Sequence, residues 1–433
     1  MRIWRQAGAM AAQTPQQRNR YVDFLRAVSI LIVIVGHWLM TTVYYFDSSL
    51  TTEHLFQIQP WTQWLTWIFQ VMPIFFIVGG FSNAVSIESA RRRGIGYGAW
   101  LSLRLNRLAI PLLALMLAWA AIAAIMYALD VSPGVIQLAS RASLIPTWFL
   151  AIYIMVVILA PAMHRVWRRL GFLSFWLLVA IAMLMDLVFF GADLHWPSWS
   201  SYFWVWLAIH NLGFAWQQGR LPSPSRLVIY AGLALVVLWL LVFYGPYPLA
   251  MVGSPDQNLS NTTPPKITLL ALAVFQFGLL MAVERPMRRA LTNLRLWTAT
   301  VLVNSMIMTI YLWHLTLMIV FIGLLYRTGG TGLDFEPGTA IWWITRPLWI
   351  AILVILLVPL ALLLSPLERL ARRADAPALS PLRQVCGAMM LCLGIALLAL
   401  FGFGGGTLPV QDAASVALIV VGAAVGGLLP GFR

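Results

Sequence analysis

Twelve apolar segments follow one another along this 433-residue chain, and no other sequence feature constrains its fold as strongly. A hydrocarbon core about 30 Å thick needs roughly 20 apolar residues in each helix that crosses it. Hydrophobic residues make up 61% of the chain and charged residues only 10%, too few charges to cover a soluble globule of this size. We therefore predict an all-α integral membrane protein, a polytopic helix bundle. The candidate spans lie at about 24–44, 64–83, 106–129, 145–163, 171–190, 199–217, 227–245, 267–284, 299–325, 340–364, 385–403 and 412–430.

The last two segments differ from the other ten. They are rich in Gly and Ala and follow a linker that contains proline and arginine. We therefore expect four parts: a cytoplasmic N-terminal segment, 1–20; a membrane core of about ten helices, 21–365; a cytoplasmic linker, 366–384; and a two-helix appendix, 385–433.

The basic residues fall mainly on alternating loops. Of the 28 basic residues, 24 lie on one predicted face, and the other face has only Arg141, Lys266, Arg327 and Arg346. Cytoplasmic loops of membrane proteins carry such an excess of Lys and Arg. The split predicts an even number of spans with both termini in the cytoplasm. It also accounts for the net charge of +14 without nucleic acid as a partner.

Three polar residues have a suggestive spacing at the start of the first predicted span and within it: Asp23, Arg26 and His37. Eleven helical steps place Arg26 and His37 on the same side of a helix, about 16 Å apart along its axis. Asp23 precedes Arg26 by three residues, so the two can pair. An imidazole can accept a proton near neutral pH, and Gly36 before it permits close approach of another helix. A structural hydrogen bond from His37 to a neighbouring helix is the alternative.

Three ionisable residues work out to a similar depth in the membrane: His37, His314 and Asp186. With a ninth span that starts near residue 299, His314 lies about 22 Å along its helix. The three predict a polar chamber if their helices adjoin, although Asp186 can instead reach the exterior interface. His210 and Asn211 in the sixth span can line this chamber, but a helix–helix hydrogen bond is favoured.

Arg104 and Arg107 stand at the cytoplasmic start of the third span. Residues three apart share a helix face, and two guanidinium groups so placed can bind a phosphate. The alternative is a role in topology alone. No cluster of His, Asp and Glu has the spacing of metal ligands, so no metal is expected.

These residues resemble the motifs of the acyltransferase-3 family of membrane O-acyltransferases. Its signature is an arginine, ten residues and a histidine, in a context matched by Tyr21, Asp23, Leu25, Arg26, Gly36 and His37. Four later segments are similar to further family motifs in the same order. They are Met72–Asn83, Arg104–Pro111, Pro146–Leu150 and Tyr311–His314.

The resemblance implies an enzyme that transfers groups other than amino-acyl groups, most simply an O-acetyltransferase. The donor would be cytoplasmic acetyl-CoA or another acyl-CoA, with no permanently bound cofactor. By motif position, His37 and Asp23 would be catalytic. Arg26, Arg104 and Arg107 would bind the donor, and Trp148, Tyr311 and His314 the substrate.

The acceptor would be a hydroxyl of a cell-envelope glycolipid or polysaccharide. The enzyme itself would lie in the cytoplasmic (inner) membrane of a bacterium, in contact with membrane lipid. The preference for arginine over lysine is typical of a GC-rich genome and favours a trehalose glycolipid or a similar envelope lipid, or a macrolide-like small molecule. Two other classes stay open: a proton-coupled transporter or flippase of an envelope lipid or small molecule, and a structural membrane subunit without chemistry.

Overall fold

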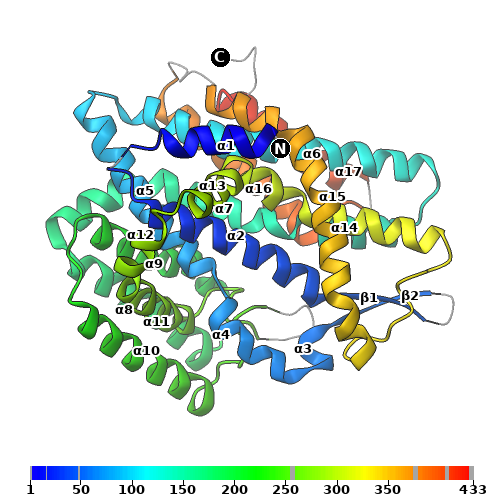
Figure 1. Ribbon diagram of the computed structural model, residues 1–433, viewed down its shortest axis with the longest axis horizontal. Coiled ribbons are helices and arrows are strands. Elements are labelled where there is room, and N and C mark those ends of the chain that lie inside the picture. The colour runs from blue at the N-terminus through cyan, green and yellow to red at the C-terminus, as the bar shows by residue number, and fades with distance from the viewer. Residues whose placement is uncertain are drawn as a thin grey trace. The chain divides into compact units, whose positions relative to one another are not determined.

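The computed structural model describes residues 2–15, 17–46, 49–253, 259–373, 379–404 and 409–428 (Figure 1). Within these ranges the elements are helices, apart from one two-stranded sheet. The contacts divide the chain into two compact units. The first comprises Met1–Gly36, His54–Ser86 and Ala160–Ile307, and the second comprises His37–Glu53, Ile87–Leu159 and Met308–Arg433.

The first unit contains most of the helices from the middle of the chain. The pairs α8–α9 and α10–α11 pack side by side, and α1 packs on α13. Its elements are α1 (Arg2–Ala12), most of α2 (Arg20–Met40), α3 (Leu55–Ile58), the 3-10 helix η1 (Pro60–Leu65), α4 (Thr66–Phe69), most of α5 (Met72–Arg92), α8 (Phe172–Gly191), η2 (Trp196–Ser200), α9 (Ser201–Gln217), α10 (Pro224–Tyr244), α11 (Ile267–Ala282), α12 (Glu284–Ala290) and α13 (Leu294–Ser305).

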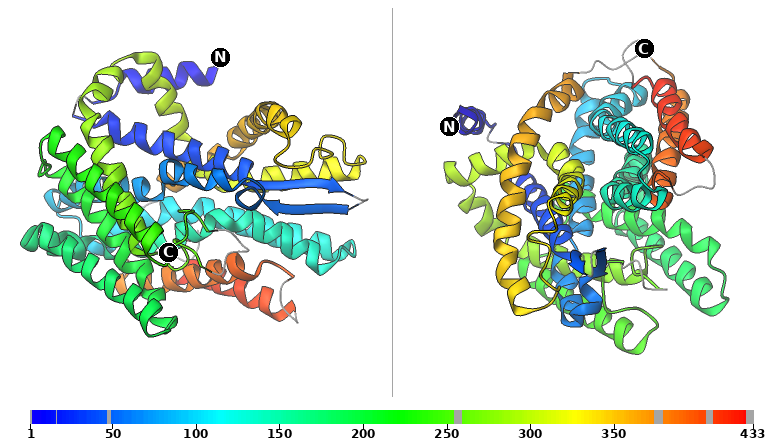
Figure 2. Two further views of the ribbon diagram at one scale, coloured as in Figure 1. Left: turned by 90° about the horizontal axis from the view of Figure 1, so that it is seen from below. Right: turned by 90° about the vertical axis from the view of Figure 1, so that its right-hand side faces the viewer.

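The second unit is built around long helices. Helix α6 packs against α15 and α16, and the C-terminal pair α16 and α17 runs side by side, in orange and red in Figure 2. Its elements are the end of α2, the hairpin β1 (Thr41–Phe46) and β2 (Ser49–His54), α6 (Tyr97–Ala128), most of α7 (Pro133–Leu170), α14 (Ile307–Arg327), α15 (Ala340–Arg373), α16 (Pro381–Phe401) and α17 (Pro409–Val425).

The predicted fold class, an all-α polytopic membrane protein, is confirmed. Among the described residues, nine helices are long and apolar enough to cross a membrane, and a tenth span results if α11 and α12, bent by 54°, count as one. The remaining two predicted segments correspond to α9 and α17, each 17 residues long. From Val205 to Trp216 every residue of α9 is buried, so this helix packs against protein on all sides.

Close contact between α5 and α9 depends on two glycines of the first unit. A Cβ atom on Gly80 would lie 2.0 Å from the His210 carbonyl oxygen, and one on Gly213 would lie 2.1 Å from the Ile77 oxygen. Small residues of this kind let membrane helices approach backbone to backbone.

Two expectations about helix boundaries were wrong. The predicted span 299–325 is divided, because α13 ends at Ser305 and α14 begins at Ile307. The Glu368 carboxylate accepts hydrogen bonds at 2.8 Å from both Thr309 N and Thr309 Oγ1, so it satisfies a first-turn N–H group that has no helical partner. In addition, residues 366–373 of the expected linker are helical and continue α15.

Candidate active site

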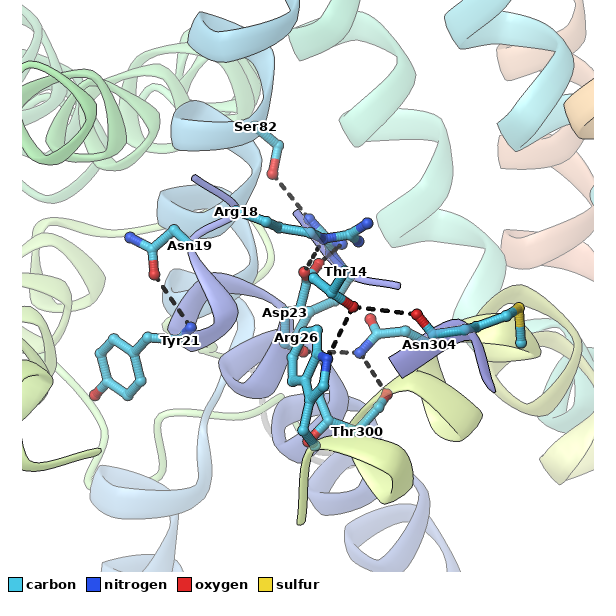
Figure 3. A network of polar contacts seen from close by, with 11 residues as sticks. Thr14, Arg18, Asn19, Tyr21, Asp23, Arg26, Ser82, Thr300 and Asn304 are labelled. Carbon is cyan, nitrogen blue, oxygen red and sulfur yellow. Dashed lines mark hydrogen bonds and ion pairs between the residues drawn. The ribbon is translucent and has the colours of Figure 1, made fainter. Parts of the chain in front are cut away.

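Asp23, in the first unit, holds two arginines at once (Figure 3). Its Oδ2 accepts from Arg18 Nε at 2.6 Å, and its Oδ1 accepts from Arg26 Nη1 at 3.1 Å. The Asp23 side chain is only 8% exposed, whereas those of Arg18 and Arg26 are 56% and 30% exposed. The predicted Asp23–Arg26 pair is therefore present, and the carboxylate orients two accessible guanidinium groups.

Other helices hold this network in place. Arg26 Nη2 donates to Ser82 Oγ on α5 at 2.8 Å, and the Asn304 side-chain amide donates to the Asp23 carbonyl oxygen at 2.9 Å (Figure 3). The hydrogen bond from Asp23 raises the pKa of Arg18, against the smaller effect of partial burial. Arg18 therefore stays charged.

Sequence reasoning missed Arg18 as a partner in this network. Arg18 precedes α2, where neither helical spacing nor a family motif draws attention to it. The available signal was its position five residues before Asp23 in a polar, basic segment.

His37 and His314 meet within the second unit. His37 Nδ1 lies 2.9 Å from His314 Nε2, and the two rings are nearly parallel, with centroids 5.1 Å apart and an interplanar angle of 4°. His314 is completely buried, and its Nδ1 lies 2.6 Å from the Tyr311 carbonyl oxygen. The next residue on α2 contributes as well, because Trp38 Nε1 donates to the His314 carbonyl oxygen at 3.2 Å.

The predicted polar chamber requires His37 and His314 to lie close together, and this contact meets that requirement. The depth estimate for His314 assumed one continuous helix from residue 299, whereas α14 begins at Ile307 and His314 lies about two turns from that start. Gly36 does not serve close approach either, because a Cβ atom there would meet nothing within 4 Å.

Tyr311 and the segment around Trp148 also come together in the second unit. Tyr311 Oη donates to the Pro146 carbonyl oxygen at 2.7 Å, and its ring packs edge-on against Phe149 at 5.9 Å. Tyr311 is buried, and Trp148 is half-buried. The substrate-binding role expected for both stays a prediction.

Arg104 and Arg107 lie on α6, in the second unit. The Arg104 guanidinium lies 5.8 Å from the centroid of the Trp100 ring, and Arg107 is exposed. Between them is Asn106, which is completely buried, with no hydrogen-bond partner for either amide atom in the described part of the chain. Ser102, one turn earlier, is also buried, and its hydroxyl has no partner there.

Asp186, the third ionisable residue predicted for the chamber, has partners of its own in the first unit. Asp186 Oδ2 accepts from Tyr247 Oη at 3.0 Å and from the Ile267 backbone N–H at 2.9 Å, and its Oδ1 lies 3.7 Å from Lys266 Nζ. Burial away from water lowers the pKa of Lys266, and the Asp186 charge opposes this effect. The alternative for Asp186, that it reaches the exterior interface, stays a prediction.

The hydrogen-bonding alternative for His210 and Asn211 is confirmed. Asn83 Nδ2 donates to His210 Nε2 at 3.1 Å, and Asn211 Nδ2 donates to Ser174 Oγ at 3.3 Å. Both contacts join neighbouring helices of the first unit.

The fold and these polar side chains define a multi-pass membrane protein with ionisable groups on helices long enough to span a bilayer. The model of the acyltransferase domain of the acyltransferase-3 family matches residues 19–366, which is most of the chain. The chain belongs to this family, and it is a membrane acyltransferase. Comparisons with curated proteins and with solved structures gave no match.

Proposed function

We propose that this acyltransferase moves an acetyl group from cytoplasmic acetyl-CoA to a hydroxyl of a cell-envelope glycolipid or polysaccharide. The observation that carries the proposal is the partly buried hydrogen bond between His37 and His314, which supports an oriented imidazole on a membrane helix. A trehalose glycolipid is the acceptor that the composition favours. We place the enzyme in the bacterial cytoplasmic membrane, where it can reach both cytoplasmic acetyl-CoA and an acceptor of the cell envelope.

The reaction needs a base and a leaving group. His37 takes the proton of the acceptor hydroxyl while the hydroxyl oxygen attacks the thioester carbonyl carbon. The carbon–sulfur bond breaks, an ester forms, and the proton on His37 passes to the departing CoA thiolate. Asp23 acts on the same helix by orienting Arg26.

Donor binding is assigned to arginine side chains. Arg26, Arg104 and Arg107 supply charge and fork-shaped donors for the phosphates of CoA. Arg18 joins Arg26 in this assignment because the Asp23 carboxylate holds both. Asn106 and Ser102 offer partners for the amides of the pantetheine arm, and their missing hydrogen bonds within the described residues support this role.

The test is acetyl transfer by purified protein in lipid. Radiolabelled acetyl-CoA and an envelope glycolipid extract are supplied to the wild type and to His37→Ala. We expect labelled lipid from the wild type and a loss of about 10²–10⁴-fold in rate for the variant, the usual contribution of a general base. A matched control is His195→Ala, because that exposed histidine lies outside the network of His37.

Two outcomes contradict the proposal in different ways. Equal transfer by wild type and His37→Ala removes His37 from the chemistry. Failure of the wild type to consume any of several acyl-CoA donors removes acyl-CoA as donor and favours the transport of an envelope lipid or small molecule.

A further inference from the structure

We infer that His314 is a positioning residue that fixes the tautomer of His37, so that Nδ1 of His37 carries the proton and Nε2 is the basic nitrogen. The inference rests on the proposed role of His37 as the base. It gives His314 a different role from the substrate binding that the family resemblance implies.

A backbone carbonyl fixes the tautomer of His314. His314 Nδ1 lies 2.6 Å from the Tyr311 carbonyl oxygen, which can only accept a hydrogen bond. His314 must therefore carry a proton on Nδ1. A full charge in the membrane interior costs several kcal/mol, so the completely buried His314 ring is neutral and its Nε2 has a lone pair.

The tautomer of His314 in turn determines the tautomer of His37. His314 Nε2 can now only accept, and it lies 2.9 Å from His37 Nδ1. Nδ1 of His37 must then be the donor. A neutral imidazole has one N–H group, so Nε2 of His37 has the lone pair that can take a proton.

Two further observations describe the geometry around this arrangement. The His314 ring is almost parallel to that of His37, at an interplanar angle of 4°, and Trp38 Nε1 donates to the His314 backbone carbonyl oxygen, which joins α2 to α14 beside the pair. The chain of hydrogen bonds is therefore carbonyl, His314, His37. In other enzymes, too, a second group orients a catalytic histidine by a hydrogen bond to the ring nitrogen that does not react.

The chain also serves the reacting state. When His37 Nε2 takes the hydroxyl proton, the ring becomes an imidazolium, and its Nδ1–H still donates to the neutral His314 Nε2. The positive charge is thus held by a hydrogen bond that already exists. No proton has to move to or from His314 during acyl transfer.

Magic-angle-spinning NMR of the full chain in lipid bilayers, with ¹⁵N-labelled histidine, tests the inference directly. The signals of His37 are identified by their loss in His37→Asn. We expect the wild type to show the proton on Nδ1 and an unprotonated Nε2. A proton on Nε2 of His37 in the wild type overturns the inference.

Two substitutions at position 314 provide the second readout. His314→Phe keeps a ring but removes the acceptor, so we expect the proton of His37 to redistribute to Nε2 and kcat to fall by about 10²-fold or more, with KM for acetyl-CoA unchanged. His314→Gln restores an amide acceptor, and we expect kcat within about tenfold of the wild type. Equal losses for Phe and Gln, or a His37 spectrum that does not change in His314→Phe, contradict the inference.

The spectra separate this inference from the proposed function. If the wild type transfers no acyl group yet carries the proton of His37 on Nδ1, the tautomer assignment is supported and the proposed reaction is wrong. If transfer occurs and depends on His37 while the proton lies on Nε2, the reaction is supported and the role of His314 is wrong.

Discussion

A buried carboxylate between two arginines is the most informative arrangement at the scale of single residues. Asp23 is nearly inaccessible, but both of its oxygens accept from guanidinium groups that stay partly exposed. Its charge offsets one of the two positive charges and fixes how the pair is presented. The remaining positive charge faces outward and suits an anionic ligand such as a phosphate.

Replacing Asp23 with Asn is expected to weaken this arrangement. An amide cannot accept from two guanidinium groups with the strength of a carboxylate, and hydrogen bonds to charged groups contribute about 1.5–3 kcal/mol each when buried. Because Arg18 is more than half exposed, the expected loss in free energy of unfolding is about 1–2 kcal/mol. Thermal unfolding in detergent measures the loss, and a rise in KM for acetyl-CoA measures the effect on the arginines.

Asp334→Asn is the matched control for that substitution, since Asp334 is exposed and belongs to the other unit. It should leave both the unfolding temperature and KM unchanged. If the two variants behave alike, Asp23 has no orienting role.

The sequence predicts contacts between residues on one helix more readily than contacts between residues far apart along the chain. The Asp23–Arg26 pair follows from helical periodicity, because both residues lie on one helix. His37 and His314 are 277 residues apart, and only an argument from depth suggested that they meet. Arg18 lies outside any periodic element, so no spacing rule connects it to Asp23. Gly36 was misread because a glycine before a histidine does not reveal which side of the helix is crowded.

At the scale of helices, the backbones of α5 and α9 approach each other closely at two glycines. Gly80 and Gly213 face each other, and a Cβ atom on Gly213 would lie 2.1 Å from the Ile77 carbonyl oxygen and 2.5 Å from the Phe81 backbone nitrogen. Neither backbone atom can move without moving its helix.

Gly213→Ala should therefore separate the two helices. Overpacking of this kind costs typically about 1–3 kcal/mol, and the shift would also stretch the hydrogen bond between Asn83 and His210. The measurement is the unfolding temperature of the purified variant, with Gly232→Ala as control. Gly232 is an exposed residue of α10 with no atom near its missing Cβ, so this control should gain about 0.5–1 kcal/mol from lower chain entropy. Equal stability of the two variants would contradict the close packing.

The apolar pattern of the sequence predicts that the helices exist. It does not predict where they end, because their ends depend on contacts with distant residues. The twelve apolar segments all correspond to helices, because burial in lipid or protein requires apolar residues in either case. The break between α13 and α14 depends on a carboxylate about 60 residues later, Glu368, which satisfies the first turn of α14. No local pattern around Met306 contains that information.

At the scale of the whole molecule, the distribution of arginines makes a prediction that the proposed chemistry requires. If both termini are cytoplasmic, the segment around Arg93 lies inside the cell and the segment around Leu194 lies outside. Both residues are exposed, so each can report its own side.

Chemical labelling of single introduced cysteines tests this topology. In a chain with Cys386→Ser and Cys392→Ala, we expect a membrane-impermeant maleimide to label Leu194→Cys on intact cells, and to label Arg93→Cys only after permeabilisation. The side of Arg93 is also the side of Arg104 and Arg107, because no predicted span separates them. Labelling of Arg93→Cys on intact cells would therefore place these arginines outside, where cytoplasmic acyl-CoA cannot reach them. That result would contradict the donor assignment and leave the family membership and the histidine pair as they are.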